Sequence, residues 1–180
     1  MDESVVYSFI FLASLILAPL LVQIRGWMPA ALFFTAAIVY AIFGVVGFAT
    51  AQIVLSQVQE SEPAHYGSYY VVSHSHFAMS LGIAMALLGA ITWVQTRFGA
   101  MRHPKLTKVL FWFLHIALIV GNSFQSVLAF ILPAPRRYTD YPEFFETYVL
   151  VSSWSGITAS ASVLGLVGLL IWSAIATWRF

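Results

Sequence analysis

The chain has 180 residues, of which 61% are hydrophobic and 8% are charged, whereas soluble domains carry about 25% charged residues. Eight Lys+Arg and seven Asp+Glu are too few to cover a water-facing surface, which excludes a soluble globular domain. The formal net charge of +1 argues against a nucleic-acid partner, which needs a basic face. The absence of cysteine excludes disulfides, iron–sulfur clusters and haem attached through cysteine.

Five apolar runs follow one another along the chain, separated by short polar segments. Each is long enough to cross a hydrocarbon core, which takes about 20 residues of helix. The fourth run ends before Pro133 and Pro135, because proline lacks the N–H and clashes with a continuing helix. We therefore expect an all-α integral membrane protein, a bundle of five transmembrane helices forming a single membrane domain over residues 1–180. The predicted spans are residues 5–23, 29–58, 69–94, 109–132 and 148–178.

The charged residues divide between the two sides of these spans. Six of the eight cations fall on one side: Arg25, Arg97, Arg102, Lys105, Lys108 and Arg179. The acids fall on the other: Asp2, Glu3, Glu60, Glu62, Asp140, Glu143 and Glu146. The positive-inside rule then predicts an outer N-terminus and an inner C-terminus. The acidic start lacks the basic region of a cleavable signal peptide, so the first run is expected to be a retained helix.

The fifth run carries small residues at a spacing of four, namely Ser152, Gly156 and Ser160. This spacing lets two membrane helices approach closely. We expect these three residues to serve packing rather than chemistry.

Three of the five histidines, His74, His76 and His115, lie inside predicted spans. An imidazole in hydrocarbon is costly unless it has a partner, so a functional role is the default interpretation. The alternative is a buried histidine that is hydrogen-bonded to a neighbouring helix. Neutral imidazole is also a common ligand of haem iron.

The spacing of His74 and His76 limits what the pair can bind. Residues i and i+2 of an α-helix are separated by about 200° around its axis, so the two rings leave opposite faces. They cannot bind one metal ion together, and each must serve a different site unless one of them only packs. His115 lies near the other end of its span and is a weaker candidate for a haem ligand.

Arg136 and Arg137 lie in the loop after the fourth run, on the acidic side, against the charge bias of the other loops. Guanidinium groups bind carboxylates bidentately. One interpretation is pairing with Asp140, Glu143 or Glu146 in the same loop. The other is that the two arginines hold the propionates of a haem whose iron is bound by His74 or His76.

Two segments resemble a known family. Residues 69–82, YYVVSHSHFAMSLG, resemble the tenth helix of subunit I of the haem–copper oxidases, closest to cytochrome c oxidase, and residues 135–142, PRRYTDYP, resemble the loop after its eleventh helix. The resemblance is good from about Tyr69 to Trp172. It implies that these five helices match the last five of the family's twelve.

By that resemblance, His74 falls where the family binds its high-spin haem, and His76 where it ligates its low-spin haem. Arg136 and Arg137 fall on the pair that holds haem propionates. The implied cofactor is haem of type b or a.

The sequence also departs from the family's pattern. The family's copper-binding histidines lie on earlier helices, so no copper site and no catalytic residue are expected here. His65 stands one place away from a His-Asp pair that serves a second metal site in the family. It is kept, with His115, as a further candidate ligand. Alone, the chain is not expected to reduce oxygen.

We therefore predict a haem-binding protein of the haem–copper oxidase superfamily without a copper centre, which transfers electrons or holds haem. Its partners are expected to be the lipid bilayer and further copies of itself in a homo-oligomer. A first alternative is the C-terminal piece of a split terminal oxidase, completed by a complementary subunit. A second is a haem or gas sensor, or a non-catalytic accessory subunit. The expected location is a bacterial or archaeal cytoplasmic membrane or the mitochondrial inner membrane.

Overall fold

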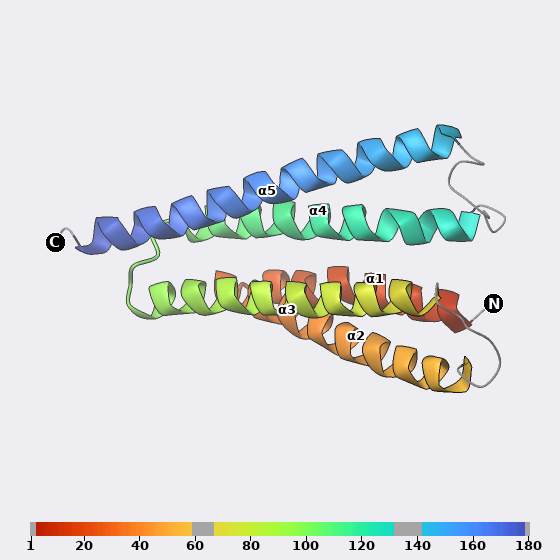
Figure 1. Ribbon diagram of the computed structural model, residues 1–180. Helices are drawn as coiled ribbons and strands as arrows, with labels where there is room; N and C mark the ends of the chain where they lie inside the picture. Colours follow the sequence, from red (N-terminus) through yellow and green to blue (C-terminus); the bar gives the residue numbers. More distant parts are fainter. Residues whose placement is uncertain (1–2, 59–66, 132–141, 179–180) are drawn as a thin grey trace. The chain divides into compact units, whose positions relative to one another are not determined.

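A computed structural model describes the backbone of residues 3–58, 67–131 and 142–178, and the side chains of residues 10–49, 76–121 and 146–177. The described backbone forms five α-helices and no strand (Figure 1). This confirms the predicted all-α class, while the orientation of the termini stays a prediction. The helices are α1 (Glu3–Ile24), α2 (Pro29–Val58), α3 (Gly67–Arg97), α4 (Pro104–Ile131) and α5 (Pro142–Trp178).

Proline and glycine fix where the helices begin and end. Helices α2, α4 and α5 each begin at a proline, whose missing N–H costs nothing in the first turn. Gly26 follows α1 and Gly99 follows α3, both with a positive φ. At Gly99, the amide of Ala100 donates to the carbonyl of Gln95 (2.8 Å) and the amide of Gly99 to that of Thr96 (3.2 Å). This pair of bonds is a Schellman motif, which satisfies the last carbonyls of the helix.

The described parts of α2, α3, α4 and α5 are long and apolar enough to cross a bilayer. Among the residues with described side chains, four stretches meet this criterion, and the described apolar part of α1, Ile10–Ile24, is shorter. The four stretches are Pro29–Ala49, His76–Arg97, Pro104–Gly121 and Glu146–Thr177. Helices satisfy their own backbone hydrogen bonds, as the hydrocarbon region demands. The chain is a multi-pass integral membrane protein.

The chain forms two compact units, residues 14–93 (the N-terminal unit) and residues 1–13 with 94–180 (the C-terminal unit). In the N-terminal unit, α2 and α3 run antiparallel and approach closely where α3 has glycine. A Cβ on Gly82 would lie 3.2 Å from the carbonyl oxygen of Ala37 and from the amide nitrogen of Ala41. One on Gly89 would lie 3.1 Å from the ring of Phe34. Glycine therefore sets the separation of this helix pair.

In the C-terminal unit, α4 and α5 lie side by side and antiparallel (Figure 1). A Cβ on Gly121 would lie 2.5 Å from the hydroxyl oxygen of Ser155, and one on Gly165 would lie 3.4 Å from the side chain of Leu110. The expected packing residue Gly156 is exposed, and nothing lies within 4 Å of a Cβ built on it. In the α4–α5 pair, the close approach is therefore made at Ser155, one residue before the predicted Gly156, and the predicted Ser160 is exposed as well.

Candidate haem site on helix α3

Both histidines of the SHSH segment lie in the α-helical backbone of α3. They are two positions apart in the sequence, so their positions differ by about 200° around the helix axis. The side chain of His74 lies outside the described residues. His76 is the first residue of α3 whose side chain the structure describes, and it lies in the described stretch His76–Arg97, which is long and apolar enough to cross a bilayer.

The side chain of His76 is exposed and lies beside an aromatic ring of α2. The ring centroids of Phe48 and His76 are 5.9 Å apart, and the ring planes are tilted by 57°. Tilted aromatic pairs at this separation are favourable. Phe48 therefore covers one side of the imidazole and leaves the rest accessible to a ligand.

An apolar groove of about 350 Å³ runs between α2 and α3. Its lining residues are Phe34, Ala37, Ile38, Ala41, Val45, Met79, Gly82, Ile83 and Ala86. Met79 lies three residues after His76, and Val45 lies three residues before Phe48, so both groove residues are one helical turn from this ring pair. The accessible imidazole therefore stands one turn beyond the end of an apolar groove.

The side chains around His76 are of the chemical types that a haem-binding surface needs. An imidazole nitrogen is a haem-iron ligand, Phe48 supplies an aromatic face, and the groove supplies an apolar surface. Among the residues with described side chains, no group of three His, Asp or Glu converges as a metal cluster would.

His115 has a different environment. It is fully buried on α4, in the C-terminal unit. Its ring stacks on Phe111, with centroids 5.2 Å apart and planes 19° apart, and meets Trp112 edge-on at 6.0 Å. This enclosure matches the interpretation of a packed histidine better than that of a free ligand.

The remaining predicted site residues, His65, Arg136 and Arg137, lie outside the described residues. Their roles stay predictions.

Sequence reasoning missed Phe48 and the groove. Phe48 is one of 15 phenylalanines, and nothing in its sequence neighbourhood distinguishes it. Its importance follows from the antiparallel register of α2 and α3, which the glycines of α3 allow but which the sequence does not state. The available signal was the pair of glycines on α3, Gly82 and Gly89, at which α2 approaches closely.

The sequence pattern of the family described as "Cytochrome C and Quinol oxidase polypeptide I" matches residues 1–167. Cytochrome c oxidase subunit 1 of Cereibacter sphaeroides is 32% identical over 135 residues, which are 74% of this chain and 23% of that protein. The Albinaria turrita subunit 1 is 30% identical over 115 residues, 63% of this chain and 58% of that protein.

The Candida albicans subunit 1 is 33% identical over 110 residues, 60% of this chain and 20% of that protein. The chain thus spans between a fifth and three fifths of the length of these curated relatives. No solved structure matches it significantly.

Proposed function

Because the chain belongs to the cytochrome c and quinol oxidase polypeptide I family, we propose that it is a membrane protein that binds haem through His74 and His76. In this proposal the haem is of type b or a, and the protein transfers electrons or holds the cofactor. The observation that carries the proposal is the accessible imidazole of His76, which lies beside Phe48 and one turn beyond the apolar groove of α2 and α3.

Each residue has a distinct role in this proposal. His76 offers a ring nitrogen to iron, Phe48 restrains the imidazole, and His74 serves a second site on the opposite side of α3. Arg136 and Arg137 hold the propionates through paired N–H donors. When bound, haem supplies one-electron oxidation and reduction. The low-dielectric groove excludes water from the apolar side of the site.

The proposal includes an assembly. Helix α3 would offer one imidazole on each of two sides, so a haem held by two protein ligands would need the second ligand from elsewhere. A second copy of this chain is the simplest source, which makes the protein a homo-oligomer in the bilayer. We propose that this assembly contains no copper centre.

Histidine substitution tests the haem proposal. His74→Ala and His76→Ala, singly and together, are compared with His103→Ala. His103 is an exposed histidine immediately before α4 and lies outside the proposed site. We expect the double variant to lose haem while the His103→Ala protein keeps the full absorbance spectrum. An unchanged spectrum in the double variant would rule the proposal out.

A second candidate follows from the share of the relatives that the chain covers. It spans 23% of the Cereibacter sphaeroides subunit 1, and a partner chain could supply the remainder. In that case the protein is the C-terminal piece of a split terminal oxidase. A co-purified complex with copper, two haems and oxygen consumption would favour this candidate, whereas a single-component preparation with one haem type and no copper would count against it.

A further inference from the structure

The turn between α3 and α4 is held in one conformation by contacts within the C-terminal unit. The Schellman bonds at Gly99 close the turn. Gln95 donates a 2.7 Å side-chain hydrogen bond to the carbonyl of Leu170 on α5. Arg102 donates a 2.8 Å bond to the carbonyl of Ala176, in the last turn of α5, where a cation is also favoured by the helix dipole. These bonds fix the turn, and we call residues 97–108, which include it, the platform.

This platform is strongly basic. Arg97, Arg102, His103 and Lys105 are exposed and Lys108 is half-buried. The only carboxylate with a described side chain in the C-terminal unit is Glu146. It lies 30 residues before Ala176 on the same helix, which is about 45 Å at 1.5 Å per residue. The positive charge of the platform therefore has no counter-charge in the described part of this unit.

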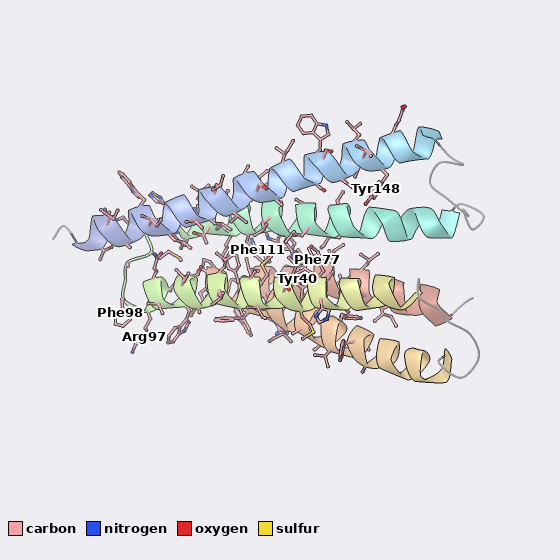
Figure 2. All side chains as sticks on the ribbon, in the orientation of Figure 1. Tyr40, Phe77, Arg97, Phe98, Phe111 and Tyr148 are labelled. Atoms are coloured by element: carbon pink, nitrogen blue, oxygen red, sulfur yellow. The ribbon has the colours of Figure 1, made fainter. Side chains whose placement is uncertain are left out.

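Apolar side chains are interleaved with these cations. Phe98 follows Arg97 and is 77% exposed, and Leu106 follows Lys105 and is 46% exposed. Arg97 and Phe98 project together at the end of α3 (Figure 2). A soluble acidic partner would match the charge but would leave this ring in water. The boundary between headgroups and acyl chains accommodates both, because cations reach the phosphates while apolar rings lie deeper.

We propose that the α3–α4 turn binds the phosphate of an anionic phospholipid through Arg97 and Lys105, with Phe98 inserted among the upper acyl carbons. The turn lies on the side that the charge distribution predicts to be cytoplasmic, where membrane leaflets are anionic. This site does not depend on haem.

Lipid retention tests the proposal. Purified, delipidated full-length protein in detergent is mixed with phosphatidylglycerol or phosphatidylcholine, and bound lipid is counted by native mass spectrometry. We expect phosphatidylglycerol to be preferred several-fold. Arg97→Gln and Lys105→Gln should each weaken its binding about fivefold, from about 1 kcal/mol per cation near a surface. Equal binding of the two lipids would overturn the proposal.

Matched variants separate the site from general charge. Arg25→Gln removes the same charge from an exposed arginine of the N-terminal unit and should leave the preference intact, as should the charge-conserving Arg97→Lys. Phe98→Ser should weaken both lipids without changing the preference. If Arg25→Gln costs as much as Arg97→Gln, or if inorganic phosphate displaces the lipid fully, the turn is not a lipid site.

Discussion

The ring centroid of Phe48 on α2 lies 5.9 Å from the ring centroid of His76 on α3. This contact joins two helices, and the sequence of neither helix predicts it. It restrains the one histidine of the proposed haem site whose side chain the structure describes. The first prediction follows from this contact.

Replacing Phe48 with leucine should weaken haem binding without abolishing it. Aromatic pairs contribute about 0.5–1.5 kcal/mol beyond their buried area, so we expect haem affinity to fall roughly two- to tenfold. Haem titration of the apoprotein, followed by absorbance, measures the change. Phe113→Leu is the control, since Phe113 is 57% exposed on α4. Equal affinities in the two variants would show that the ring pair has no role in binding.

A methyl group at Gly82 should separate α2 from α3. The new Cβ would lie 3.2 Å from backbone atoms of Ala37 and Ala41, which cannot rotate away. Overpacking of this kind costs about 1–3 kcal/mol. Gly168→Ala adds the same methyl where nothing lies within 4 Å. The comparison cancels the helix preference of alanine. In a titration with a denaturing detergent, followed by circular dichroism, Gly82→Ala should unfold earlier than Gly168→Ala, and coincident curves would contradict the packing described.

The contact between Gly121 and Ser155 predicts a rescue. A Cβ at Gly121 would lie 2.5 Å from the hydroxyl oxygen of Ser155, which donates a 2.9 Å hydrogen bond to the carbonyl of Ser152. Gly121→Ala should therefore destabilise the α4–α5 pair, and adding Ser155→Ala should restore stability. A double-mutant cycle on unfolding free energies should give a coupling of about 0.5–3 kcal/mol. Strictly additive effects would argue against this register.

His115 should matter to stability rather than to haem. It is fully buried, between Phe111 and Trp112, and truncating a large buried side chain costs about 2–5 kcal/mol. We expect His115→Ala to unfold earlier and to keep the wild-type haem content. Ile116→Ala is the control, because Ile116 is 52% exposed. Loss of haem to the extent seen in His76→Ala would instead make His115 a ligand.

Much of the fold follows from the sequence because lipid allows few alternatives. The scarcity of charge predicted helices, and prolines 29, 104 and 142 mark where three of them begin. Gly99 marks the end of α3, since a positive φ suits glycine. The limits of a helix are thus predictable from single residues at its two ends.

The register between two helices cannot be predicted from single residues in this way. Gly156 has the spacing of a packing residue, yet Gly121 and Ser155 make the close approach. The partner of His76 could not be predicted either, because Phe48 differs from other phenylalanines only in its place across the α2–α3 pair. The chemistry of the site was predictable from residue type, whereas its surroundings required the packing.

The most direct test of the central claim is a pyridine-haemochrome spectrum of the purified, unsubstituted protein, with copper measured on the same sample. The account predicts haem of a single type, b or a, in proportion to protein, and no copper. A sample that contains no haem, or one that contains copper with two haems, would contradict it.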